Sequence, residues 1–137
     1  MANSFEVSIQ VAAPPEEVWA LAGDPARIGE WFPPVVASEM DGDVRRATMG
    51  NGAVLVERIT RRDDHARSYA YSVMEGIPGL TRHEAVISVE GAEAGSRVRW
   101  SQDAESEVEG YDAEARLRKV MQQGLESLRD MMEGVGD

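Results

Sequence analysis

Residues 117–132 read LRKVMQQGLESLRDMM, and they carry the one long helical pattern of the chain. Apolar residues recur there at steps of three and four, which is the spacing of an amphipathic helix. Asp112 is a suitable N-cap before this pattern and Gly134 follows it, so the expected helix runs from about Asp112 to Glu133. Such a helix has one apolar face to bury, and the rest of the chain has to cover that face.

The sequence before this helix alternates with the period of β-strands. Pro14-Pro15 with two glutamates, and then Asp24-Pro25, begin two short helices after the first strand. Short turns join the later strands, which indicates an antiparallel meander. The sequence therefore predicts the α+β class, in which a curved antiparallel sheet of about seven strands wraps around the long C-terminal helix. The expected strands are Phe5–Val11, Val35–Met40, Arg45–Met49, Ala53–Arg62, Arg67–Glu75, His83–Glu90 and Ser96–Ala104.

The length and composition of the chain exclude several classes of function. The 137 residues suit a single domain over residues 1–137. Lys and Arg total 14 against 25 Asp and Glu, so the formal charge is −11 and nucleic acid is an unsuitable partner. No apolar run is long enough to span a bilayer and no signal-peptide pattern begins the chain, so we expect a cytoplasmic protein. With no cysteine and no phosphate or dinucleotide motif, we expect no metal and no cofactor; monomer and homodimer both remain open.

Several short motifs follow one another in a specific order. They are APPEEVW at 13–19, residues 24–31 with Pro33 after them, VERI at 56–59, Asp63-Asp64, YAYSV at 69–73, the strand ending at Trp100, and Gly124-Leu125 with Leu128. In this order the chain resembles the START-like, helix-grip (SRPBCC) superfamily, and within it the bacterial polyketide cyclase/dehydrase-like proteins. The resemblance covers nearly the whole chain. It implies a cavity between the sheet and the last helix that takes a small hydrophobic or aromatic molecule.

Strand alternation assigns the more apolar face of each long strand to the interior. In the resembling family the segment around Trp31 borders the cavity, and the final helix adds its apolar face. The expected ligand-binding residues are Trp31, Leu55, Glu57, Ile59, Tyr71, Val73, His83, Ile87, Trp100, Val120, Met121, Gly124 and Leu128.

Glu57 is the unusual member of this set, because it lies between Leu55 and Ile59 on an apolar face. A buried carboxylate costs several kcal/mol unless it is paired, hydrogen-bonded or protonated. The hairpin after it places Tyr71 or Val73 across the ladder, so a tyrosine hydroxyl is the expected partner. Two interpretations stay open: a structural carboxylate held by Tyr71 or water, and a ligand-contacting group. The resemblance to the abscisic-acid receptors, which carry a pocket-lining glutamate at the matching place, supports the second.

His83 is the other titratable candidate. Alternation puts it on the same side as Glu75, so we expect these two residues to face each other near one end of the sheet. The pair then either binds a polar ligand end or moves a proton, or it is a half-exposed ion pair at the rim. The second histidine, His65, falls in a turn and is expected to be exposed.

Three functions compete. The first is a carrier or binding protein for a small hydrophobic ligand with a polar end. The second is a polyketide cyclase/dehydratase-type enzyme, with Glu57 or His83 as the base and Tyr71 as an oxyanion donor. The third is a protein-interaction module whose interior is filled. A continuous void of several hundred Å³ would favour the first two functions over the third.

Overall fold

Seven strands form one antiparallel sheet in the order β1-β7-β6-β5-β4-β3-β2 in the computed structural model, which describes residues 2–77, 79–106 and 113–134. This confirms the expected fold class. The hairpin of β6 and β7 is longer than the two strands expected from the apolar pattern, because its paired residues continue to Ala92 and Gly95. The strands are β1 (Ala2–Val11), β2 (Val35–Asp41), β3 (Val44–Met49), β4 (Val54–Asp63), β5 (Ser68–Glu75), β6 (Leu80–Ala92) and β7 (Gly95–Ser106).

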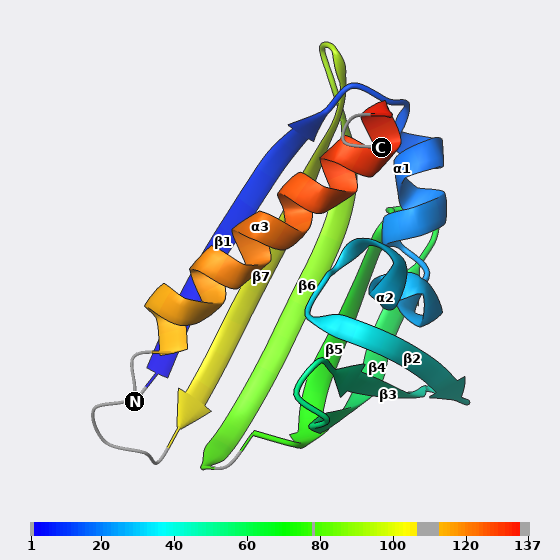
Figure 1. Ribbon diagram of the computed structural model, residues 1–137. Helices are drawn as coiled ribbons and strands as arrows, with labels where there is room; N and C mark the ends of the chain where they lie inside the picture. Colours follow the sequence, from blue (N-terminus) through cyan, green and yellow to red (C-terminus); the bar gives the residue numbers. More distant parts are fainter. Residues whose placement is uncertain (1, 78, 107–112, 135–137) are drawn as a thin grey trace.

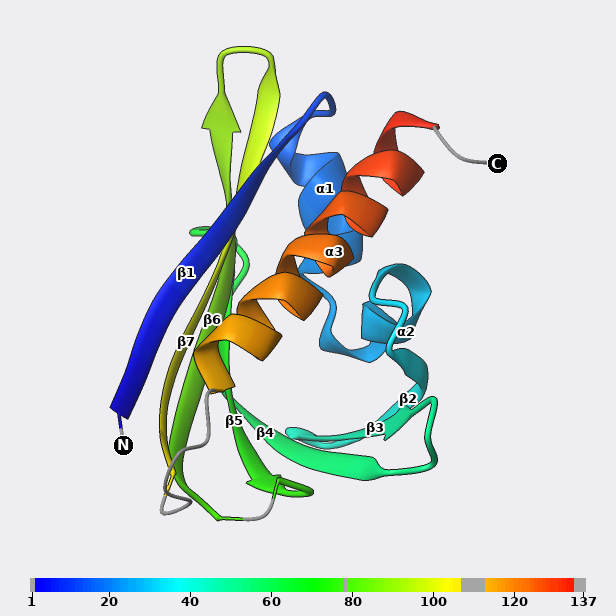
Figure 2. The same ribbon diagram turned by 60° about the vertical axis from the view of Figure 1, so that its left-hand side comes forward.

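One long helix, α3 (Ala113–Glu133), crosses the concave face of the sheet and packs against β1 (Figures 1 and 2). The short elements α1 (Pro15–Ala22), η1 (Pro25–Arg27) and α2 (Ile28–Trp31) lie beside it on the same face. Strands β2 to β4 curl beneath these helices (Figure 2). The expected N-cap of the long helix, Asp112, lies outside the described residues.

Local chemistry begins and ends the short helices. Pro15 occupies the first turn of α1, and Gly23 follows its last residue. A Cβ atom at Gly23 would lie 2.2 Å from the ring of Trp19, so only glycine leaves room for this indole. The Trp19 indole nitrogen donates to Asp64 Oδ1 at 3.0 Å, which ties α1 to the β4–β5 turn. Asp24 then caps η1 by accepting from the Ala26 backbone nitrogen at 3.0 Å.

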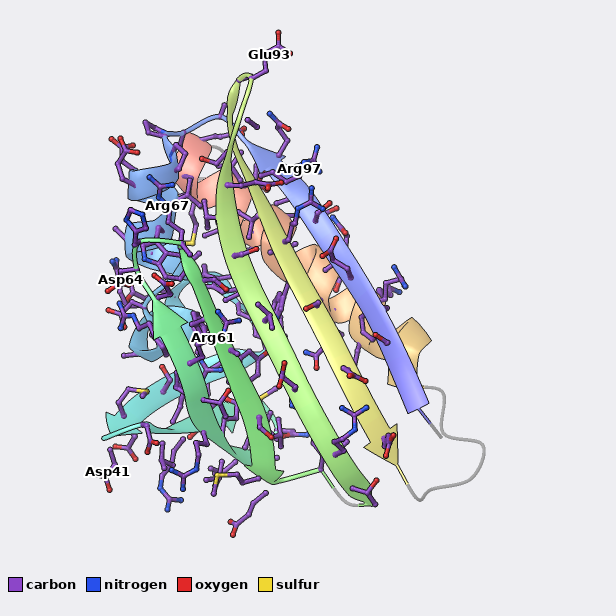
Figure 3. The ribbon with its side chains drawn as sticks, turned by 180° about the vertical axis from the view of Figure 1, so that it is seen from behind. Asp41, Arg61, Asp64, Arg67, Glu93 and Arg97 are labelled. Atoms are coloured by element: carbon purple, nitrogen blue, oxygen red, sulfur yellow. The ribbon has the colours of Figure 1, made fainter. Side chains whose placement is uncertain are left out.

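The two faces of the sheet differ in chemistry. The outer face carries charged side chains, seen from behind in Figure 3, where Arg61 and Arg97 are labelled. Several charged side chains of this face form ion pairs. Arg99, for example, lies 2.8 Å from Glu90 and 3.1 Å from Glu6. Such half-exposed pairs contribute little stability each. The inner face holds the apolar core, as the alternation of the long strands predicts.

Candidate functional site

An apolar cavity of about 180 Å³ lies between the sheet and α3. Its wall is built from β2 to β7, from α2 and from the first half of α3. Phe32, directly after α2, covers one side, and its ring packs edge-on against Trp100 with centroids 5.2 Å apart. The expected residues found on the wall are Leu55, Glu57, Tyr71, Val73, His83, Trp100, Val120 and Met121.

Other residues of the expected set lie away from the wall. Trp31 is buried behind Phe32 and packs edge-on against Trp100 at 5.5 Å. Gly124 is covered by Phe32, because a Cβ atom there would lie 2.4 Å from the phenyl ring. Ile59 instead borders a surface depression beside Pro25. The remaining two are buried elsewhere in the core, namely Ile87 and Leu128.

The sequence pattern missed Arg45. Its side chain is 0% exposed, and its Nε donates to Glu57 Oε1 at 2.9 Å, while Glu57 is 5% exposed. The two residues are direct partners across β3 and β4. Alternation within β3 was the available signal, because Arg45 and Ala47 share the buried side of that strand.

Arg45 is held on several sides. Its Nη1 donates to the Pro25 carbonyl at 3.0 Å and to the Tyr69 hydroxyl at 3.3 Å, and the guanidinium lies 4.9 Å from the centre of the Tyr71 ring. Burial alone would lower the pKa of Arg45, but Tyr69, Glu57 and Tyr71 together raise it, so the group stays charged. Its Nη2 is buried without a hydrogen-bond partner among the described residues. The Arg45–Glu57 ion pair is therefore a fixed part of the interior.

The expected hydrogen bond from Tyr71 to Glu57 is wrong. The Tyr71 hydroxyl accepts from the indole nitrogen of Trp100 at 3.1 Å, and Arg45 donates to Oε1 of Glu57. The register places Val73 opposite Glu57, with Tyr71 opposite Ile59, one step further along β5. Burial, reinforced by the charge of Glu57, raises the pKa of Tyr71, so this residue keeps its hydroxyl proton.

The expected pairing of His83 with Glu75 is also wrong. Glu75 is exposed. The register between β4 and β5 shifts between Val56 and Glu57, and this shift displaces the end of β5, where Glu75 lies, relative to β4. His83 Nδ1 instead accepts from the Val73 backbone nitrogen at 3.0 Å, and its Nε2 is bonded to Gln102 Oε1. Burial lowers the pKa of His83, which favours the neutral ring.

These contacts fix how His83 is protonated. A neutral imidazole has one donor and one acceptor nitrogen. Because Nδ1 accepts from Val73, the proton sits on Nε2 and is donated to Gln102 Oε1. Both ring nitrogens are then occupied. His65 lies exposed in the β4–β5 turn, away from the cavity.

The polar groups at the cavity are thus Glu57, Tyr71 and the His83–Gln102 pair, with Glu105 also on the wall. In the part of the chain that the structure describes, no three His, Asp or Glu side chains form a group that could hold a metal ion. No described helix is long and apolar enough to cross a membrane. The arrangement suits the capture of a mostly apolar molecule whose polar group meets Glu57 and Tyr71.

Comparison with solved structures shows the same fold in several bacterial proteins. A protein of unassigned function from Bacillus thuringiensis has 26% identity and a TM-score of 0.87, covering 96% of this chain and 99% of that one. The protein XoxI from Bacillus cereus has 27% identity and a TM-score of 0.84, covering 96% and 95%. The Zhui aromatase/cyclase from a Streptomyces species has 19% identity and a TM-score of 0.81, covering 97% and 94%, and at that identity it shows the fold alone.

The comparison with curated proteins finds no match. A sequence profile of the family described as "Polyketide cyclase / dehydrase and lipid transport" matches residues 2–133, which is nearly the whole chain. This chain therefore belongs to the polyketide cyclase/dehydrase and lipid transport family.

Proposed function

We propose that this protein binds one small, mainly apolar molecule with a polar end in the cavity between the sheet and α3. The observation that carries the proposal is the cavity itself, an apolar space of about 180 Å³ with Glu57 and Tyr71 on its wall. Ligand sites in proteins have this character: mostly apolar walls with a few placed polar groups. The family also includes lipid transport in its description, which agrees with a carrier.

The size of the cavity limits the ligand. An engineered apolar cavity of roughly 150 Å³ binds benzene. A space of about 180 Å³ therefore suits a single ring with one or two substituents, or a short chain of similar volume. A ligand with several fused rings needs Phe32 or another wall residue to move.

The alternative is a cyclase/dehydratase-type enzyme, which the family description and the fold of an aromatase/cyclase keep open. A general base needs a lone pair that can reach the substrate proton. Both nitrogens of His83 are occupied by Val73 and Gln102, which argues against His83 in this role. Glu57 then remains the candidate base and Tyr71 the candidate oxyanion donor. The cavity of about 180 Å³ is smaller than the several hundred Å³ that would favour binding or catalysis outright. The interior of the protein is nevertheless not filled, so an interaction module with a filled interior is the least favoured function.

The proposed binding site can be tested by filling the cavity with a larger side chain. Val120 is half-buried on the cavity wall, whereas Gln123 is exposed on the same helix. We expect p-xylene and p-cresol to bind the natural protein with a stoichiometry near one, measured by ligand-observed NMR and calorimetry. Val120→Trp should abolish this binding, because the indole takes up the space of the ring.

The matched control is Gln123→Trp, which adds the same side chain outside the cavity and should leave binding unchanged. Circular dichroism of both variants checks that the fold persists. If neither probe binds the natural protein, or if folded Val120→Trp binds them as before, the proposed site is wrong.

A further inference from the structure

We propose that the ligand's polar group is a neutral hydroxyl of the phenol class, which donates to Glu57 and accepts from Tyr71. This rests on the proposed function and adds the chemistry of the polar end. The inference comes from the hydrogen-bonding positions that the protein itself leaves open at the cavity.

The first open position is on Glu57. A carboxylate has two acceptor oxygens. Arg45 Nε takes Oε1 at 2.9 Å, and no described residue donates to Oε2. Since Glu57 is on the cavity wall, Oε2 is the acceptor offered to a ligand.

The second open position is on Tyr71. Its hydroxyl oxygen accepts from Trp100 at 3.1 Å, and no described residue accepts the hydroxyl proton. The raised pKa of Tyr71 keeps that proton in place. Tyr71 and Glu57 are diagonal neighbours across β4 and β5, and the Arg45 guanidinium contacts both. One donor and one acceptor therefore adjoin the same end of the cavity.

Gln102 adds a further donor. Because His83 donates from Nε2, the amide oxygen of Gln102 has to face the imidazole. Its NH₂ group is then left without a partner among the described residues, and Gln102 lies on the wall. The cavity thus offers one acceptor and two donors to a polar group.

The charges at the cavity argue against a ligand whose polar group is itself charged. A ligand carboxylate would meet the Glu57 anion, whose countercharge is already supplied by Arg45. A ligand ammonium would meet a Glu57 carboxylate whose charge is already balanced by Arg45, which is buried and remains charged. Burying a further unpaired charge beside this ion pair, whose net charge is zero, is costly. A hydroxyl satisfies both open positions without adding charge.

The experiment compares four toluenes substituted at the para position: p-xylene and p-cresol, which have the same shape, and p-toluate and 4-methylbenzylamine, which carry a charge and are slightly larger. A hydroxyl buried without partners would bind far more weakly than the isosteric methyl group. We therefore expect p-cresol to bind at least as tightly as p-xylene, and the anion and the cation about tenfold or more weakly than p-cresol.

Tyr71→Phe removes one hydroxyl and keeps the ring. It should weaken p-cresol about tenfold and change p-xylene by less than about twofold, which corresponds to one hydrogen bond. The control is Tyr69→Phe, since Tyr69 is buried on the same strand, bonds to Arg45 and is absent from the cavity wall. This control should leave both affinities unchanged.

A second variant removes the carboxylate acceptor without leaving a lone buried charge: Arg45→Met combined with Glu57→Leu should also weaken p-cresol about tenfold relative to p-xylene. If p-xylene binds but p-cresol binds tenfold more weakly, or if Tyr71→Phe leaves their ratio unchanged, the hydroxyl inference is overturned while the binding site stands. If neither compound binds, the proposed function itself fails.

Discussion

At the scale of single residues, the Arg45–Glu57 pair has the largest energetic consequence. Both side chains are buried and joined at 2.9 Å, and Arg45 also reaches Pro25 and Tyr69. Removing one member leaves the other charged in an apolar interior, which typically costs about 3–5 kcal/mol. Replacing both members with apolar residues of similar volume is often neutral or stabilising.

We therefore expect Arg45→Met to lower the free energy of unfolding by about 3–5 kcal/mol, measured by urea denaturation. The double variant Arg45→Met with Glu57→Leu should recover most of that loss. Arg58→Met is the control, because Arg58 forms a half-exposed pair with Asp43 in the β2–β3 turn and should cost less than about 1 kcal/mol. Equal losses in the two single variants would contradict the buried pair.

His83 gives a pH dependence with a definite sign. Burial lowers its pKa in the folded state, while the unfolded chain titrates near 6.5. Below pH ~6.5 the unfolded state binds more protons, so the contribution of His83 to stability is complete above this pH and is lost as the pH falls towards the folded pKa.

We expect His83→Gln to flatten the fall in stability below pH ~6.5, measured by urea denaturation at a series of pH values. His65→Gln replaces the only other histidine, in an exposed turn, and should keep the slope of the natural protein. A slope that stays the same in His83→Gln, or that disappears in His65→Gln, would refute this assignment.

At the scale of elements, α3 meets the segment that follows α2 through a glycine. Gly124 is buried, and a Cβ atom there would lie 2.4 Å from the Phe32 ring that covers the cavity. Alanine is a better helix former than glycine by about 1 kcal/mol. The clash nevertheless dominates, because overpacking a filled contact typically costs about 1–3 kcal/mol.

Gly124→Ala should therefore destabilise the protein despite its helix propensity, with a lower melting temperature in calorimetry. It should also weaken p-xylene binding, since Phe32 has to shift on the cavity wall. Gln123→Ala, at the exposed neighbouring position, should change neither quantity. If Gly124→Ala proved more stable than the natural protein, the Phe32 ring would have to move aside without destabilising the fold.

The elements also show where sequence reasoning succeeds. Period-two strands and the single period change near residue 111 were sufficient to predict the fold, and alternation placed Glu57 inside. The register of the strands was harder to predict from the sequence, because the shift between Val56 and Glu57 moves Glu75 away from His83. A bulge is set by local backbone geometry, which side-chain periodicity does not report. Arg45 was missed because its short strand carries arginine on both faces.

At the scale of the whole molecule, the curved sheet and α3 leave a small space instead of a filled core. Large side chains reduce it from several directions: Phe32 and Trp100 from one side, Met121 from the helix. The volume of about 180 Å³ is therefore a property of a few wall residues, on a fold that is shared with proteins of other sequences. Changing one wall residue should change which ligand fits.

Met121→Ala is the sharpest test of this relation between wall and ligand. Truncating a buried methionine costs about 2–5 kcal/mol and leaves a larger space. We expect calorimetry to show that 2-naphthol, which has two fused rings, binds this variant more tightly than the natural protein, while p-cresol binds more weakly because it no longer fills the site. Leu128→Ala is the matched control: Leu128 is fully buried on the same helix but away from the cavity wall, so it should cost similar stability without altering the preference. If both variants shift the preference alike, ligand size is governed by overall loosening of the core; if only Met121→Ala does so, it is governed by the wall, as the geometry requires.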